Sequence, residues 1–353
     1  MRDLNLKGNH FPISKAFLIF LAKEFGGATE YDDTIYWGDQ HLETNQPPLN
    51  TQNLNNVISS IKDKDVVKFL INKAHHIAGN LLISNKELID SLQNNYKFYL
   101  IVSPPRSGGT YITKNLYKSL GINPKLLPSF FGHDGFPSVN QEWYKKNSNG
   151  YINFVQSTVW QFSEWLTMAD YYLPKIIDNS GKRVIIIKII KSHNNLNFFR
   201  SLLGGNACFI LNKRSIIDLY FSVIDKAGGI DNNDISTNPR NNIESWIINE
   251  YLSQKHNVNN IKESYIEILG RYYYSFYMRI LSGGFRNGDN KIVNYDKSSI
   301  YDVCKSIICT YNNDLLSLEK FIVNDYSARY NEELVNVAQN YDDKINSLFQ
   351  FFD

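Results

Sequence analysis

Cysteine is scarce in this sequence. The 353 residues include only Cys208, Cys304 and Cys309, and none of them belongs to a CxxC pair. An odd number without paired spacing argues against a disulfide framework and against a cysteine-based zinc site. Cys208 lies in an apolar run, where a cysteine usually packs as a small hydrophobic side chain.

Long apolar runs are also missing. The best candidate near the N-terminus, residues 16–22, is closed by Lys23 and Glu24. It is much shorter than the roughly 20 residues that cross a bilayer. No small-residue cleavage site follows it, so a secretory signal is not indicated. We therefore expect a soluble, cytoplasmic protein without a membrane span.

The chain has almost no net charge. Lysine and arginine number 37 and the acidic residues 35. Proteins that bind nucleic acids in general carry a basic excess or a basic patch. A nucleic-acid partner is therefore not expected.

Residues 98–110 carry the clearest functional pattern. An apolar, β-branched run at 98–102 reaches the segment Ser-Pro-Pro-Arg-Ser-Gly-Gly-Thr, and a helix-like pattern follows directly. A strand, a tight loop and a helix in this order point backbone N–H groups and a helix dipole at an anion such as a phosphate. The segment adds a guanidinium, hydroxyl groups and glycines that let the backbone approach the anion closely. The residues expected to contact it are Arg106, Ser107, Gly108, Gly109 and Thr110.

This loop lacks the lysine of P-loop NTPases. Their pattern, G-x-x-x-x-G-K-[ST], places a lysine directly before a magnesium-binding hydroxyl residue. Here Gly109 is followed by Thr110 and Tyr111. A phosphate site of this kind indicates chemistry other than ordinary ATP or GTP hydrolysis.

A second strand is expected at 184–190, where six of the seven residues are Val or Ile. Such a run is typical of a buried strand in a parallel sheet. It is followed by Lys191, Ser192 and His193, and not by the acidic residue that holds magnesium in many phosphoryl-transfer enzymes. Open parallel sheets bind ligands at the carboxyl ends of their strands. We therefore expect a cation and an imidazole at the site, and no metal.

A third polar pair follows a short apolar run at 208–211. Arg214 stands in the turn after that run, and Ser222 lies eight residues further on, within a helix-like pattern over 216–225. Eight residues is a little more than two helical turns, so both side chains can face the same side. A guanidinium and a hydroxyl group in this arrangement suit a second phosphate.

Together these stretches resemble the sulfotransferases that use 3′-phosphoadenosine 5′-phosphosulfate (PAPS). The loop at 103–111 is similar to their 5′-phosphosulfate loop, commonly Y-P-[KR]-S-G-[TS]-T-W, and Lys-Ser-His at 191–193 is similar to their K-T-H. Arg214 and Ser222 have the spacing of the family's 3′-phosphate residues, and KIVNYD at 291–296 resembles a late strand that ends in Y-E-D. A match to the family's R-K-G-x-x-G loop is not found.

The resemblance implies roles for individual residues. His193 would be the general base, while Lys191 and Arg106 would stabilise charge on the transferred sulfuryl group. Tyr111 would stack on adenine, and the Arg214–Ser222 pair would hold the 3′-phosphate. PAPS would be the co-substrate and 3′-phosphoadenosine 5′-phosphate (PAP) the product, with no metal required.

Several alternatives stay open at this stage. His133 is a rival for the general base. The acceptor is a small molecule, a lipid or a glycan with a hydroxyl or amine group, and the sequence does not specify which. The chain could instead be a divergent P-loop kinase or NTPase, which predicts magnesium-dependent ATP binding. It could also be a non-catalytic nucleotide- or glycan-binding module, which predicts PAP binding without turnover.

The expected fold is α/β, with a central, mainly parallel sheet flanked by helices, as in the P-loop-like sulfotransferases. Residues 1–95 are expected to form a mostly helical N-terminal extension with an amphipathic helix over 63–82. Residues 96–353 are expected to form the α/β domain, with a helical tail over 315–351 and a turn-rich loop at 228–242. The oligomeric state is not indicated.

Overall fold

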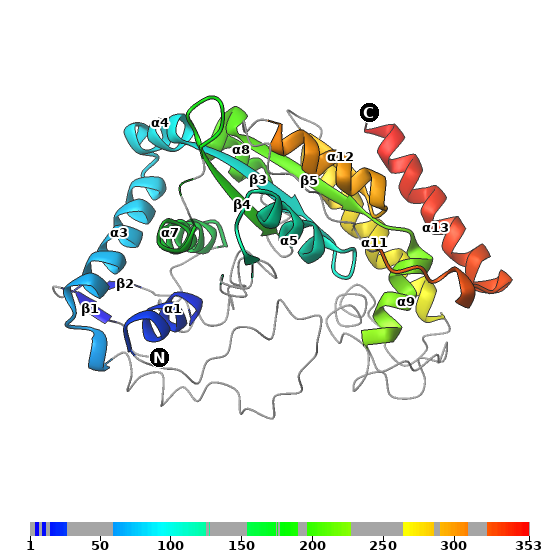
Figure 1. Ribbon diagram of the computed structural model, residues 1–353, viewed down its shortest axis with the longest axis horizontal. Coiled ribbons are helices and arrows are strands. Elements are labelled where there is room, and N and C mark those ends of the chain that lie inside the picture. Colours follow the sequence, from blue (N-terminus) through cyan, green and yellow to red (C-terminus); the bar gives the residue numbers. More distant parts are fainter. Residues whose placement is uncertain are drawn as a thin grey trace.

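The computed structural model describes residues 4–6, 9–11, 15–26, 59–124, 127, 154–173, 175, 177–189, 196–226, 264–285, 290–309 and 323–352. Figure 1 shows the arrangement of the helices and strands. In chain order they are β1 (Leu4–Leu6), β2 (Asn9–Phe11), α1 (Lys15–Gly26), α3 (Asp65–Leu82), α4 (Lys86–Asn95), β3 (Tyr96–Val102), α5 (Gly109–Ser119), α7 (Phe154–Tyr172), β4 (Arg183–Ile189), α8 (Leu196–Leu203), η5 (Gly204–Asn206), β5 (Ala207–Lys213), α9 (Ile216–Lys226), α11 (Tyr265–Ser282), β6 (Asn290–Asn294), α12 (Lys297–Ile308), η8 (Ser327–Arg329) and α13 (Glu332–Phe351).

The central sheet has four parallel strands in the order β4-β3-β5-β6. This confirms the expected α/β class with a parallel sheet flanked by helices. The apolar runs expected as strands at 98–102, 184–190 and 208–211 form β3, β4 and β5, with boundaries shifted by up to two residues. A separate antiparallel pair, β1 and β2, precedes the helices described within residues 1–95.

Alternation of side chains across the strands decides what covers each face of the sheet. Phe98 of β3 contacts Phe162 of α7, and Phe162 also contacts Phe199 of α8, so α7 and α8 cover one face. Helix α5 covers the other face, where its Tyr117 donates a hydrogen bond to the carbonyl oxygen of Ile186 (2.9 Å). Burying each large apolar side chain between these layers stabilises the fold by roughly 1.5–3 kcal/mol.

The order of the strands creates a switch point beside β3. The chain passes from β3 to β4 on one side and then returns to β5 on the other side. Connections that leave two neighbouring strands in opposite directions open a crevice at the carboxyl ends of those strands, and open α/β sheets bind ligands there. The loop after β3 and the residues after β5 therefore meet at the expected ligand position.

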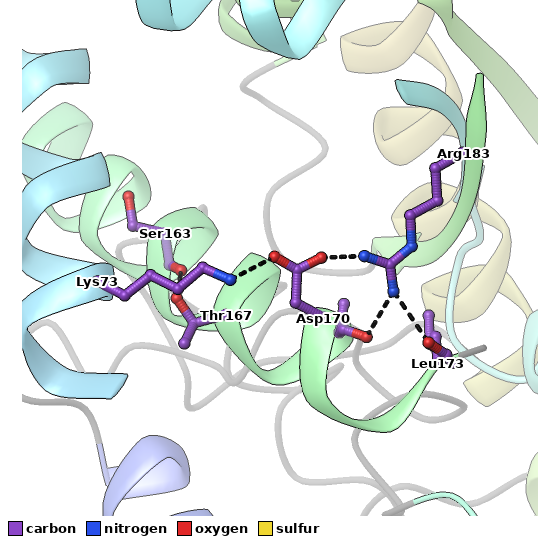
Figure 2. A network of polar contacts seen from close by, with 7 residues as sticks. Lys73, Ser163, Thr167, Asp170, Leu173 and Arg183 are labelled. Carbon is purple, nitrogen blue, oxygen red and sulfur yellow. Dashed lines mark hydrogen bonds and ion pairs between the residues drawn. The ribbon is translucent and has the colours of Figure 1, made fainter. Parts of the chain in front are cut away.

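An ionic network joins the N-terminal region to the sheet. The carboxylate of Asp170 in α7 accepts a hydrogen bond from Lys73 of α3 (2.7 Å) and another from Arg183 at the start of β4. Arg183 also donates to the carbonyl oxygen of Leu173 (2.9 Å), as Figure 2 shows. One carboxylate thus connects α3, α7 and β4, away from the carboxyl edge of the sheet.

Helix α3 confirms the amphipathic helix expected over 63–82, although it begins at Asp65. Its side chains at helical spacing are buried and belong to the same hydrophobic core as the strands, so the core is continuous across residues 95 and 96. The division into an extension and a domain at that point stays a prediction. Residues 1–95 do supply part of the shared core.

The C-terminal helix is shorter than expected. Among the described residues of the 315–351 segment, 323–331 contain only the short η8, and α13 begins at Glu332. Asn331 explains this start, because its side chain accepts a hydrogen bond from the N–H of Leu334 (2.9 Å) and caps the helix. Helix α13 packs against α9 and α11 (Figure 1). None of the helices in the described ranges has both the length and the apolar character of a membrane span.

Candidate functional site

The loop between β3 and α5, residues 103–108, is fixed by buried hydrogen bonds. The hydroxyl group of Ser107 donates to the carbonyl oxygen of Pro104 (2.6 Å) and lies 2.9 Å from the hydroxyl oxygen of Ser103. Asn212, at the end of β5, donates to the carbonyl oxygen of Ser107, and Tyr273 of α11 donates to that of Pro105 (2.7 Å). A loop held from several sides is preorganised, so it loses little conformational freedom when it binds a ligand.

Two residues of this loop have left-handed backbone conformations. Gly108 has φ +94°, and a Cβ at this position would overlap the ring of Tyr295. Arg106 has φ +60°, which is uncommon for a residue with a side chain. Such a conformation costs on the order of 1–3 kcal/mol and occurs preferentially at functional sites. Helix α5 starts directly after Gly108, which has no side chain to cap its first N–H groups.

The conformation of Arg106 directs its side chain toward α9. Its Nη2 donates to the carbonyl oxygen (3.1 Å) and the hydroxyl oxygen (3.2 Å) of Ser222. Arg214 in turn donates from Nη1 to the carbonyl oxygen of Arg106 (2.9 Å). Arg106 thus links Arg214 and Ser222 through its backbone carbonyl and its side chain.

Two tyrosine rings cover Arg214. Its guanidinium carbon lies 4.4 Å from the ring centroid of Tyr295 and 5.7 Å from that of Tyr326. Tyr295 reaches this place because its N–H continues the pairing of β6 with β5 by donating to the carbonyl oxygen of Lys213 (2.8 Å). Burial raises the pKa of Tyr295 although Arg214 acts in the opposite direction. The phenol is therefore neutral and presents its ring face to the cation.

Arg214 is a buried cation without a described counter-charge. It is only 6% exposed, and its Nε and Nη2 find no hydrogen-bond partner among the described residues. An unpaired buried charge is costly, whereas a guanidinium that binds an anion through two N–H groups makes one of the stronger polar contacts in proteins. The arrangement is suited to bind an anion beside Ser222.

A second cation reaches the loop from β4. Lys188 is 4% exposed, and its Nζ donates to the hydroxyl oxygen of Thr110 in the first turn of α5 (2.8 Å). A Cβ on Gly109 would overlap the Ser103 side chain and lie 3.1 Å from Cε of Lys188. Glycine at 109 therefore allows the lysine and the loop to come together.

The start of α9 is capped by a carboxylate from the C-terminal helix. Asp342 of α13 accepts hydrogen bonds from the N–H of Ile216 at 3.1 and 3.3 Å. Burial raises the pKa of Asp342 to about 6, against the opposing effects of this N–H and of Lys213. Helix α13 therefore fixes the position of the helix that carries Ser222.

Most of the residues expected at the site lie in the described part of the structure. Arg106 and the residues at 107–111 lie in the loop and the first turn of α5, beside Arg214 and Ser222. The ring of Tyr111, which was expected to stack on adenine, lies edge-on to Tyr295 with centroids 6.3 Å apart. Lys191, His193 and the rival base His133 lie outside the described residues, as does the loop at 228–242.

One histidine elsewhere in the described part is half-buried between two helices. The ring of His75 in α3 lies edge-on to that of Trp160 in α7, with centroids 5.1 Å apart. Burial lowers its pKa to about 4, so it is neutral at physiological pH. Glu164 and Trp165 of α7 are 1% and 0% exposed and belong to the interior.

Three residues of the site were not identified from the sequence: Lys188, Tyr295 as the ring over Arg214, and Asn212. Lys188 did carry a signal, because it is the single charged residue within an Ile-rich run.

In the described ranges, no group of three or more His, Cys, Asp or Glu side chains has a metal-binding arrangement. Comparisons with protein-family models, with curated proteins and with solved structures found no match for this chain.

Proposed function

We propose that this chain is a PAPS-dependent sulfotransferase with a P-loop-like sulfotransferase fold. It would transfer a sulfuryl group to a hydroxyl or amine group of a small-molecule, lipid or glycan acceptor and release PAP. The observation that carries the proposal is the buried guanidinium of Arg214, with N–H groups that no described residue accepts, beside Ser222 and next to the anion-binding loop. A nucleotide with separate 5′- and 3′-phosphates can use both positions, whereas the contiguous phosphates of ATP need only the loop.

The residues present fit PAP chemically. Arg214 offers two unpartnered donors and Ser222 a hydroxyl group, and a phosphate dianion accepts hydrogen bonds from both. Arg106 would contribute to the same subsite, since its guanidinium already contacts Ser222. The first-turn N–H groups of α5 would hold the 5′-phosphate at the positive end of the helix dipole.

The reaction needs a base and a cation near the transferred group. PAPS supplies the activated sulfuryl group; a bond forms between the acceptor atom and sulfur while the bond from sulfur to the phosphate oxygen breaks, and PAP leaves with that electron pair. His193 is the proposed acceptor of the proton, a common role of histidine in general base catalysis. Lys191 is the proposed cation that stabilises charge as it develops.

Turnover of PAPS to PAP, with a panel of hydroxyl and amine acceptors, tests the proposal. Activity should survive EDTA, because the chain places Lys-Ser-His and not an acidic ligand after β4. Loss of activity on chelation, restored by magnesium together with ATP, would favour the kinase alternative. Tight PAP binding with no turnover of any acceptor, and no slow hydrolysis of PAPS, would favour a binding module.

The choice of base can be tested with two alanine variants. His193→Ala should abolish most of the turnover, and His133→Ala should leave it close to wild type. The reverse result would place the base in the 130–138 segment and would remove the assignment of Lys-Ser-His to the catalytic motif.

A further inference from the structure

Lys188 occupies an unusual place for a lysine. It pairs with Ile101 of β3 near the carboxyl end of β4, the edge strand of the four-stranded sheet, on the face that α5 covers. The two residues before it, Ile186 and Ile187, are buried, and Lys188 itself is only 4% exposed. An ammonium group in such surroundings is costly unless polar groups compensate for its lost hydration. The position therefore calls for polar partners, and the hydroxyl group of Thr110 is one of them.

The side chain of Lys188 ends at the phosphate-binding end of α5. Its Nζ donates to Oγ1 of Thr110 (2.8 Å), and Thr110 belongs to the first turn of the helix. In a P-loop, the lysine and the hydroxyl residue are neighbours in sequence, and both act on the bound phosphates. Here the hydroxyl residue comes from the loop, and a lysine from the neighbouring strand lies beside it.

We propose that Lys188 supplies the phosphate-binding lysine that the loop itself lacks, and that it contacts the 5′-phosphate of the nucleotide. The proposal rests on the proposed function in so far as the anion at α5 belongs to an adenosine nucleotide. It adds a residue that neither the loop pattern nor the Lys-Ser-His segment identifies.

The two cations serve different phosphates because they approach the loop from opposite sides. β4 and β5 flank β3, and Lys188 comes from β4, while Arg214 follows β5. Lys188 donates a hydrogen bond in the first turn of α5, whereas Arg214 donates one to the carbonyl oxygen of Arg106. The side chain of Arg106 in turn donates to Ser222. The unpartnered, buried donors of Arg214 are an independent indication that this loop receives an anion.

Isothermal titration calorimetry with three ligands distinguishes the two subsites. AMP carries only the 5′-phosphate, adenosine 3′-monophosphate carries only the 3′-phosphate, and PAP carries both. Lys188→Met should weaken AMP and PAP about ten- to hundredfold, the effect of losing a charged hydrogen bond, and leave adenosine 3′-monophosphate unchanged. Arg214→Met should weaken PAP and adenosine 3′-monophosphate and leave AMP unchanged. Lys118→Met, an exposed lysine at the far end of α5, is the matched control and should alter none of the three affinities.

The stability of the ligand-free variants completes the test. A thermal melt without ligand checks that Lys188→Met is folded, since the change removes the hydrogen bond to Thr110. Lys188→Gln keeps an N–H donor for Thr110 and allows the same titrations if the methionine variant does not fold. Unchanged AMP affinity in either variant, while the wild type binds PAP tightly, would overturn the role of Lys188 and leave the proposed function standing. A wild-type protein that binds neither PAP nor AMP would overturn both.

Discussion

Replacing Arg214 with methionine should remove the affinity for a 3′-phosphate and leave the ligand-free protein as stable as before, or more stable. The guanidinium is buried and two of its nitrogen atoms lack a described partner, so the apo protein holds a charge that is poorly solvated. Methionine keeps most of the apolar contact with Tyr295 and Tyr326. The lost hydrogen bond from the charged guanidinium to the Arg106 carbonyl oxygen costs about 1.5–3 kcal/mol, which the removal of the buried charge offsets.

The loss of PAP affinity follows from the contacts that Arg214 can make. A hydrogen bond to a charged group contributes about 1.5–3 kcal/mol. Because about 1.4 kcal/mol corresponds to a tenfold change in Kd, the affinity for PAP should fall about ten- to hundredfold. AMP should bind as before. Titration calorimetry gives both affinities, and a thermal melt without ligand gives the stability.

Arg200→Met is the matched control. Arg200 of α8 also stacks on an aromatic ring, with its guanidinium carbon 4.7 Å from the Phe209 centroid, but it donates to the carbonyl oxygen of Phe285 and not to the loop. Its replacement should change stability and not the preference for PAP over AMP. If Arg214→Met lowers the melting temperature by several degrees and keeps that preference, Arg214 is a structural residue and the argument for a second phosphate fails.

Three further changes test other parts of the account. Gly108→Ala should destabilise the protein by several kcal/mol and reduce PAP binding, since its Cβ would overlap the Tyr295 ring at a φ of +94°. The control Gly121→Ala, at a φ of +75° with open space around it, should cost about 1 kcal/mol and leave binding intact. Equal melting temperatures of the two variants would contradict this geometry. Asp342 has a pKa raised from 3.8 to about 6, so the folded state binds its proton more tightly than the unfolded state and the free energy of unfolding falls as pH rises from about 4 through about 6. The free energy of unfolding of Asp342→Asn should therefore rise by at most about 3 kcal/mol relative to that of the wild type between pH 4 and pH 7. Denaturant unfolding measures this difference, and a difference that does not change with pH would refute the prediction. His193→Ala should lower turnover by about two to four powers of ten with PAP affinity unchanged, and full activity in that variant would exclude His193 as the base.

Local patterns in the sequence predict the fold well where hydrophobic periodicity decides the structure. The apolar runs that form β3, β4 and β5 are buried in the parallel sheet, and the spacing of apolar residues in α3 matches its buried face. The loop after β3 was also predictable, because glycines and a proline pair between a strand and a helix leave few other conformations.

The direction of single side chains could not be predicted. Arg106 was expected to act on the transferred group, but its left-handed backbone turns the guanidinium toward Ser222, and nothing local in the sequence encodes that φ. Lys188 was missed since its role depends on the register of β4 against β3, which brings it to Thr110. Tyr295 was matched only as part of a strand-end motif, and its contact with Arg214 depends on the pairing of β6 with β5.

The central claim is that the site holds two separate phosphates of one nucleotide. Isothermal titration of the wild-type protein with PAP, AMP and ATP plus magnesium tests it most directly. The account predicts that PAP binds at least about tenfold more tightly than AMP or ATP, with or without EDTA, because only PAP places a phosphate at Arg214 and Ser222. Equal affinities for PAP and AMP, or binding of ATP that requires magnesium and exceeds that of PAP, would contradict it.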